Sequence, residues 1–321
     1  MDTLVLGGSR FVGLHLVQLL HSQRHKVTVL NRGLTRTELP AGVRRLKADR
    51  HSPAEMTDAL EGKGYDTVFD ISGYTADDVE AVLTPLADGI GHYVFCSSTA
   101  VYAPSELGPV REDFPLFHAP GARPYARDKV ACEDLLMDAH ARGRLSVTVV
   151  RPPYVYGPHN TLPQREFAYF ARLIRGRSLI IPDQGLRHWH SVHVEDLAAL
   201  FAAVPGWSQA LGQAYTACAD AAITANGYVQ ALEEVMGVRA EIVNVDSTDP
   251  GLTDGSVFPF GDGASSIYAN DKARSDLDWA PNYTMRDGLE MTYRWWREEG
   301  LDQEEWDFSK DDEVLRRVSH I

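Results

Sequence analysis

The sequence has few cysteines, fewer basic than acidic residues and no long hydrophobic run. Its three cysteines, Cys96, Cys132 and Cys218, lie far apart and form no C-x-x-C pair, which argues against a disulfide framework or a zinc knuckle. The 321 residues include 31 Lys and Arg against 45 Asp and Glu. The resulting formal charge of −14 disfavours a nucleic-acid partner held by bulk electrostatics.

Two further absences bear on location. No apolar run approaches the roughly 18 residues of a membrane span. The N-terminus is typical of a strand rather than a signal peptide, because the first basic residue comes after the apolar run. We therefore expect a soluble cytoplasmic protein with no membrane partner.

Short runs rich in Val, Leu and Phe alternate with helical patterns through the first half of the chain. Strands are predicted at 3–7, 26–31, 43–49, 66–72, 92–98 and 145–151, and helices at about 11–21, 53–60, 76–86 and 125–141. This alternation predicts an α/β fold with a doubly wound parallel sheet, buried on both faces.

The stretch LVLGGSRFVG, residues 4–13, predicts a strand, a tight phosphate-binding turn and a helix start. Gly7 would make the turn and Gly13 would let the helix pack closely on the strand. In the middle of the turn, where a dinucleotide fold usually has another glycine, the chain has Arg10. At the end of the second strand Asn31 and Arg32 replace the acid that binds an adenosine 2′-hydroxyl.

These cations bear on the cofactor. Arg32 would attract a 2′-phosphate, and Arg10, projecting towards the same ribose, would supply a second positive charge. The sequence therefore favours NADP, with NAD and two solvent-facing arginines as the alternative.

Tyr125 and Lys129 are four residues apart at the start of a predicted helix, hence on one face. They follow the run FCSSTAVY, which contains Ser98. A phenol of pKa about 10 is a poor base, but a nearby ammonium favours the phenolate. Ser98 could then hydrogen-bond the substrate oxygen, so the three residues predict proton transfer coupled to hydride transfer.

With these motifs in this order, the chain resembles the extended short-chain dehydrogenase/reductases, a family of sugar-nucleotide epimerases, dehydratases and reductases. The resemblance covers the glycine turn, SSTAVY (97–102), Tyr125-x-x-x-Lys129, RPPYVYGP (151–158), VHVEDLA (192–198) and DLDWAPNYTMRDGL (276–289). Ser98, Tyr125 and Lys129 match the family's catalytic trio. Arg10 departs from the family's common pattern. A glycine turn with this arginine resembles that of an atypical branch, which includes chloroplast stem-loop RNA-binding proteins.

After Arg151 the chain becomes rich in proline and turn residues and alternates less regularly, which places the main domain boundary near residue 152. We expect a Rossmann domain at 1–152 with return segments at about 189–217, and a smaller, mainly substrate-binding domain at 153–321. A strongly charged terminal helix would be docked by Trp306 and Leu315. The candidate cofactor contacts are Gly7, Gly8, Ser9, Arg10, Phe11, Val12, Gly13, Asn31, Arg32, Asp49, Arg50, Ser72, Gly73, Tyr125 and Lys129. The candidate substrate contacts are Tyr74, Ser98, Thr99, Tyr154, Arg187, His188 and His190.

Thr99 and Ala100 stand where family dehydratases carry an Asp-Glu pair, so neither can act as acid or base in water elimination. What remains is an epimerase or a reductase acting on a secondary alcohol or ketone of a sugar-like substrate. His188 and His190 would share a strand face, but no nearby acid completes a ligand set, so no metal site is predicted.

Two other classes stay open: an RNA-binding protein on the same fold, and a redox-sensing protein that binds the cofactor without turning over. We also expect a homodimer through two helices per subunit, as in the family. Apolar residues that cannot all face one sheet support this expectation; they are Val79, Val82, Leu83, Val130, Leu135 and Leu136.

Overall fold

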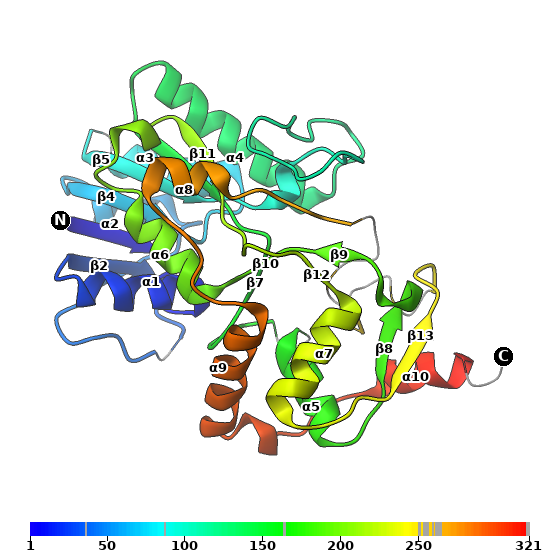
Figure 1. Ribbon diagram of the computed structural model, residues 1–321. Coiled ribbons are helices and arrows are strands. Elements are labelled where there is room, and N and C mark those ends of the chain that lie inside the picture. Colours follow the sequence, from blue (N-terminus) through cyan, green and yellow to red (C-terminus); the bar gives the residue numbers. More distant parts are fainter. Residues whose placement is uncertain are drawn as a thin grey trace. The chain divides into compact units, whose positions relative to one another are not determined.

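The chain folds into two compact units (Figure 1). The first comprises Met1–Pro153, Val194–Cys218 and Tyr268–Pro281, and the second comprises Tyr154–His193, Ala219–Ile267 and Asn282–Ile321. The computed structural model describes residues 1–35, 37–86, 88–162, 165–249, 252, 257–258, 260 and 265–318.

This division differs from the predicted domains at two places. The return to the first unit begins at Val194 rather than 189, because residues 188–193 pair with strands of the second unit. A further segment, Tyr268–Pro281, also belongs to the first unit.

The first unit is built on a seven-stranded sheet of order β11-β6-β5-β4-β1-β2-β3, in which all neighbours are parallel. The strands are β1 (Asp2–Leu6), β2 (Lys26–Asn31), β3 (Arg44–Lys47), β4 (Tyr65–Asp70), β5 (Ile90–Cys96), β6 (Val147–Arg151) and β11 (Gln213–Thr216). The direction of winding reverses between β1 and β4, which is the switch point where doubly wound sheets bind ligands. The predicted doubly wound parallel sheet is confirmed.

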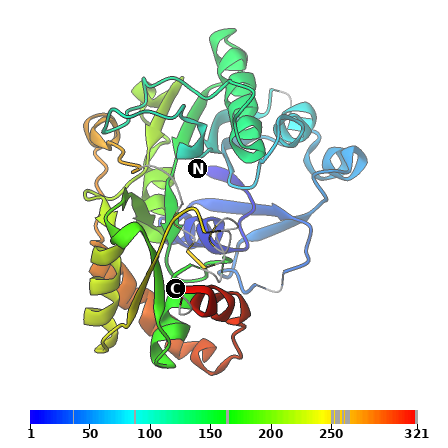
Figure 2. The same cartoon turned by 90° about the vertical axis from the view of Figure 1, so that its right-hand side faces the viewer.

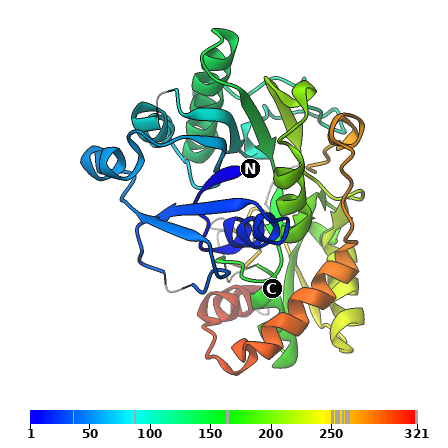
Figure 3. The same cartoon turned by 90° about the vertical axis from the view of Figure 1, so that its left-hand side faces the viewer.

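Helices cover both faces of this sheet. They are α1 (Phe11–Ser22), α2 (Pro53–Leu60), α3 (Ala76–Leu86), α4 (Pro124–Ala141), α6 (Val194–Ala203) and α8 (Asp271–Leu277). On one face α1 and α6 pack together, and on the other α2, α3 and α4 pack in a row. Figure 3 shows α1 (blue) and the light-blue helices α2 and α3 on opposite sides of the blue strands. The apolar strands are therefore buried on both faces, as their lack of polar alternation predicts.

The helix row changes the basis of the predicted dimer. Val79, Val82, Val130 and Leu136 are at most 3% exposed, and Leu83 and Leu135 pack against the same buried cluster. Four of the six side chains are therefore buried within this unit, where α3 and α4 also contact each other, while Leu83 and Leu135 are only partly buried, and the homodimer stays a prediction.

The second unit gathers short strand pairs and helices around an aromatic core. Its elements are β7 (Tyr154–Tyr156), β8 (Leu179–Pro182), β9 (His188–Trp189), β10 (Ser191–His193), β12 (Ile223–Thr224), β13 (Ile242–Val245), α5 (Glu166–Ile174), α7 (Ala225–Met236), α9 (Met285–Glu298) and α10 (Ser309–Val318). Trp189 and Phe260 stack with ring centroids 4.7 Å apart. The C-terminal α10, red in Figure 2, is held by a buried ion pair of 2.6 Å between Arg172 Nε and Asp311.

Trp306 and Leu315 are partly buried and pack against this core, in the role predicted for them. Among the described residues, no helix is long and apolar enough to cross a membrane.

His92, on β5, gives the first unit a dependence on pH. The Thr148 hydroxyl donates its proton to the Ala210 carbonyl at 2.6 Å, so His92 Nε2, 2.9 Å from the same hydroxyl, must be the donor to it. Burial, helped by the charge of His140, lowers the pKa of His92 to about 4. The folded protein therefore keeps this imidazole neutral where the unfolded chain would protonate it.

Because the folded pKa lies below the unfolded one, this stabilisation is full above about pH 6.5 and is lost towards pH 4. Between pH 7 and pH 5 His92 should account for about 2 kcal/mol of the fall in the free energy of unfolding. Urea unfolding of wild type and His92→Gln at both pH values measures this share. Identical losses in the two proteins would contradict it.

Candidate active site

The glycine turn after β1 is fixed by close approach of backbone to backbone. Gly7 has a positive φ of 83°, which favours glycine. A Cβ on Gly13 would lie 2.2 Å from the Gly7 carbonyl oxygen, and a Cβ on Gly8 would lie 2.8 Å from a Val17 methyl group. The three glycines therefore let α1 begin directly against the end of β1. This cradle fits the phosphates of a dinucleotide at a helix N-terminus.

Arg10 and Phe11 open helix α1. Arg10 is its exposed, extended N-cap residue, and Phe11 has a φ of 40°, a strained value for a residue with a side chain. Burial raises the pKa of the Tyr74 phenol, and the positive charge of Arg10 acts against that rise. This interaction lies on the β4 side of β1, whereas Arg32 follows β2 on the other side.

The end of β2 has the form expected of a ribose-binding strand end without a carboxylate. The Asn31 Oδ1 atom accepts a hydrogen bond of 2.8 Å from the Gly33 amide, which shapes the turn. Arg32 between them is exposed. Its guanidinium can therefore meet a phosphate from solvent.

A buried carboxylate lies at the carboxyl end of β4. Asp70 is fully buried and binds Arg50 through two hydrogen bonds of 2.8 and 3.1 Å. It also accepts hydrogen bonds from the Tyr93 hydroxyl at 2.7 Å and the Ser72 amide at 3.1 Å. Burial opposes the charge on Arg50, but the Asp70 carboxylate outweighs it and raises the pKa of the guanidinium. Arg50, predicted to contact the cofactor, is thus bound to Asp70 and shapes the loop that carries Ser72 and Gly73.

Asp49, another predicted cofactor contact, precedes Arg50 in the chain. Its carboxylate accepts a hydrogen bond of 3.0 Å from the His51 amide, which shapes the turn after β3.

Lys129 joins α4 to the ends of two strands. Lys129 is 2% exposed, and its ammonium donates 2.6 Å hydrogen bonds to the carbonyls of Gly73 and Cys96. It also lies over the rings of Phe95 and Tyr74, at 4.7 and 5.1 Å from their centroids. Burial lowers the pKa of Lys129. Two of its three donors are used by these carbonyls, which leaves one N–H for a ligand.

The other two members of the predicted trio also lie in the first unit. Tyr125 is in the first turn of α4, about 6 Å along the helix axis from Lys129, and 46% of its surface is exposed. Ser98 follows β5, and its hydroxyl accepts a 3.2 Å hydrogen bond from the Ala100 amide. Thr99 is buried, and its amide donates to the Pro152 carbonyl at 3.0 Å. The structure thus brings Gly73, Tyr74 and Lys129 together and leaves Tyr125 about half exposed.

A second buried ion pair lies behind the trio, and the sequence reasoning missed it. Glu133, one helical turn after Lys129, binds Arg151 at 2.6 Å and accepts a hydrogen bond from the Ser97 hydroxyl. Both charged residues are at most 6% exposed, and Arg151 lies 4.9 Å from the centroid of the Tyr102 ring. This pair ties α4 to β6 and to the residue before Ser98. The two partners are 18 residues apart on different elements, so no local spacing in the sequence points to this pair.

The remaining predicted substrate residues belong to the second unit. Tyr154 starts β7, with the guanidinium of Arg165 5.2 Å from its ring centroid. Arg187 forms an ion pair with Asp183 and donates to the Ser247 hydroxyl at 3.1 Å.

The two candidate histidines differ in their surroundings. His188 is exposed, while burial lowers the pKa of His190 to about 4. His190 is therefore neutral at physiological pH. Within the described residues, no group of three His, Cys, Asp or Glu side chains is placed to hold a metal ion.

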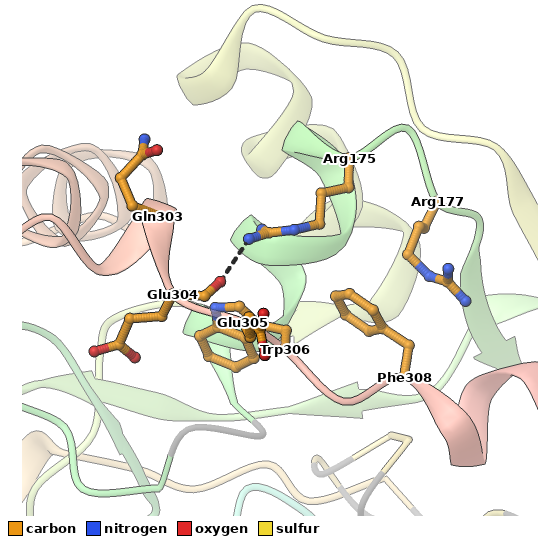
Figure 4. Close-up of a pocket in the computed structure, with 7 residues that line it drawn as sticks. All are labelled: Arg175, Arg177, Gln303, Glu304, Glu305, Trp306 and Phe308. Carbon is orange, nitrogen blue, oxygen red and sulfur yellow. Dashed lines mark hydrogen bonds between the residues drawn. The ribbon is translucent and has the colours of Figure 1, made fainter.

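The second unit also has an open hollow of about 460 Å³ (Figure 4). The two arginines that line it are both bonded to other residues of the second unit. Arg175 donates to the carbonyls of Asp302 and Glu304, and Arg177 pairs with Asp312 and lies 4.6 Å from the Phe308 ring centroid. No predicted site residue lines it.

Comparison with known proteins places the chain in a family. Residues 3–215 match the NAD dependent epimerase/dehydratase family. The chain is 30% identical over 329 residues to the chloroplast stem-loop binding protein of 41 kDa b of Arabidopsis thaliana, covering 98% of this chain and 84% of that protein. It is also 30% identical over 205 residues to 2′-dehydrokanamycin reductase of Streptomyces kanamyceticus, which covers 63% of this chain and 57% of the relative.

A solved structure shares the fold. The UDP-glucose-4-epimerase of Stenotrophomonas maltophila, with bound NAD and formylated UDP-arabinopyranose, superposes with a TM-score of 0.80 at 21% identity, over 94% of this chain and 99% of that one. The chain therefore belongs to the NAD dependent epimerase/dehydratase family of extended short-chain dehydrogenase/reductases and is an NAD(P)-dependent epimerase or oxidoreductase.

Proposed function

We propose that this chain transfers hydride between NADP and a secondary alcohol or ketone of a sugar-like substrate, as an epimerase or a reductase. The observation that carries the proposal is the buried ammonium of Lys129, held at the ends of β4 and β5 one turn from Tyr125. The dinucleotide supplies or accepts the hydride. The glycine cradle after β1 and the switch point between β1 and β4 fit such a ligand.

Each member of the trio has a separate task. The Tyr125 phenol moves the proton to or from the substrate oxygen, and the nearby positive charge of Lys129 favours its phenolate form. The third N–H of Lys129 would hold the nicotinamide ribose of a bound dinucleotide. Ser98 orients the substrate oxygen by a hydrogen bond. Dehydration is disfavoured because Thr99 and Ala100 carry no carboxyl group.

A sugar-like substrate is supported by the 30% identity, over 63% of this chain, to 2′-dehydrokanamycin reductase, whose name describes a reduction of 2′-dehydrokanamycin. We place Tyr74, Ser98 and Thr99 on the substrate side in the first unit. Tyr154, Arg187, His188 and His190, in the second unit, stay proposed substrate contacts on the family resemblance alone.

We also propose a cytoplasmic homodimer. This assembly rests mainly on the family resemblance, since four of the six helix residues taken to support it are buried and only Leu83 and Leu135 are partly exposed. Light scattering at micromolar concentration measures it, and a monomer would remove it.

A second candidate function is RNA binding. It is favoured by the identity of 30% over 98% of the chain to a chloroplast stem-loop binding protein. The formal charge of −14 and the presence of Ser98, Tyr125 and Lys129 speak against it. A shift of labelled stem-loop RNA at physiological salt would favour this function over turnover.

The cofactor preference is directly testable. Because Arg32 is exposed and no carboxylate occupies the end of β2, NADP(H) should bind more tightly than NAD(H). Losing a charge-assisted contact costs about 1.5–3 kcal/mol, so Arg32→Gln should weaken NADP binding about tenfold or more while NAD binding stays unchanged. Calorimetric titration measures both. Arg24→Gln, an exposed arginine after α1, is the matched control. Equal affinities of wild type for the two dinucleotides would contradict the preference.

The chemistry makes a separate prediction. Tyr125→Phe removes the proton-transfer group, which is worth roughly a hundred- to ten-thousand-fold in rate, and should leave dinucleotide affinity nearly intact. Lys129→Met removes one ammonium that serves both roles, so turnover and affinity should both fall. Oxidation of NADPH with a panel of keto-sugars measures turnover. Tyr293→Phe, on α9, controls for loss of a phenolic hydroxyl elsewhere. Unchanged turnover in Tyr125→Phe would refute the assignment.

A further inference from the structure

The short edge strand β3 ends beside the predicted ribose site. In the parallel pair β2–β3, Lys47 is the register partner of Asn31, and the Ala48 amide donates to the Asn31 carbonyl at 3.1 Å. Both strands therefore reach the carboxyl edge of the sheet at the same level. The residue after Asn31 is Arg32, so a second cation stands across from it on the neighbouring strand.

The side chain of Lys47 runs along the turn that carries Arg32. Its Cδ and Cε atoms lie 3.4 and 3.5 Å from the position that a Cβ on Gly33 would occupy. Gly33 also has a φ of 71°, a backbone conformation that favours glycine over residues with a side chain. The turn can therefore lie close to the lysine stem. The aliphatic stem of Lys47 thus lies against the backbone next to Arg32, and Lys47 as a whole is exposed.

The strand alternation places Lys47 and Arg45 on one face and Leu46 on the other. Leu46 packs against the buried cluster that includes residues of α2 and α3. Arg45 donates to the Thr37 carbonyl, and the Thr37 hydroxyl donates to the Ser9 carbonyl at 2.7 Å. The face that carries Lys47 is therefore the one over which the loop after β2 is tied to the glycine turn.

Arg32 and Lys47 are both exposed cations at this end of the sheet. Among the described residues, no ion pair engages Arg32 or Lys47, although 45 acidic residues are present in the chain. Two cations that flank one strand end without a carboxylate partner suit a dianionic ligand, because each can donate hydrogen bonds to a phosphate.

We infer that Lys47 is a specificity-determining residue that binds the adenosine 2′-phosphate of NADP from β3, opposite Arg32 on the β2 side. The inference rests on the proposed preference for NADP and adds a residue outside the glycine turn and the β2 end. It makes recognition of the 2′-phosphate a property of two neighbouring strands.

Calorimetric titration of NADP and NAD into wild type, Lys47→Ala and Lys26→Ala tests the assignment. Lys26 is also an exposed lysine but lies at the amino end of β2, about 16 Å along the strand from Asn31. Lys47→Ala should weaken NADP binding about tenfold and leave NAD binding unchanged. Lys26→Ala should leave both affinities unchanged. Lys47→Arg keeps the positive charge and should bind NADP about as tightly as wild type.

The outcomes separate the two proposals. If wild type prefers NADP and Lys47→Ala keeps the full preference, the role of Lys47 is overturned and the cofactor proposal stands. If Lys47→Ala weakens NADP and NAD equally, the lysine acts on a group common to both dinucleotides and the assignment is also overturned. Equal affinities in wild type would overturn both proposals.

Discussion

The buried ammonium of Lys129 is the interaction on which the candidate site depends. Its two carbonyl partners come from the loop after β4 and from the end of β5, so one side chain holds a helix and two strand ends together. Burial lowers the pKa of Lys129, while two hydrogen bonds and the faces of two aromatic rings stabilise the charge that remains. The same geometry leaves the ammonium one donor for a ligand and places it a helical turn from Tyr125.

Two buried ion pairs keep this arrangement in place. Asp70 and Arg50 fix the loop that supplies the Gly73 carbonyl, and Glu133 and Arg151 fix α4 to β6 and to Ser97. Removing one partner of such a pair leaves an uncompensated buried charge, which is strongly destabilising. The position of α4 and of the loop after β4 is therefore set by buried charges outside the proposed catalytic trio.

Local pattern was enough to predict the sheet, the glycine turn and the place of Lys129. The helices Pro53–Leu60 and Ala76–Leu86 match the predicted ranges because each has clear apolar periodicity and end signals. Contacts between residues far apart in the sequence could not be predicted from local pattern. Nothing near Arg50 in the sequence points to Asp70, 20 residues away, and the apolar residues of α3 and α4 could not be assigned to a core without knowing that the helices pack on each other. Residues 268–281 return to the first unit through spatial contacts alone.

We propose that the lysine that anchors α4 is also the group that receives the dinucleotide. A crystal structure of the protein with NADP bound tests this most directly. We predict that Lys129 Nζ keeps its bonds to the Gly73 and Cys96 carbonyls and lies within about 3 Å of a nicotinamide ribose hydroxyl. A dinucleotide bound along the glycine turn with its nicotinamide ribose out of reach of Lys129 would contradict the claim.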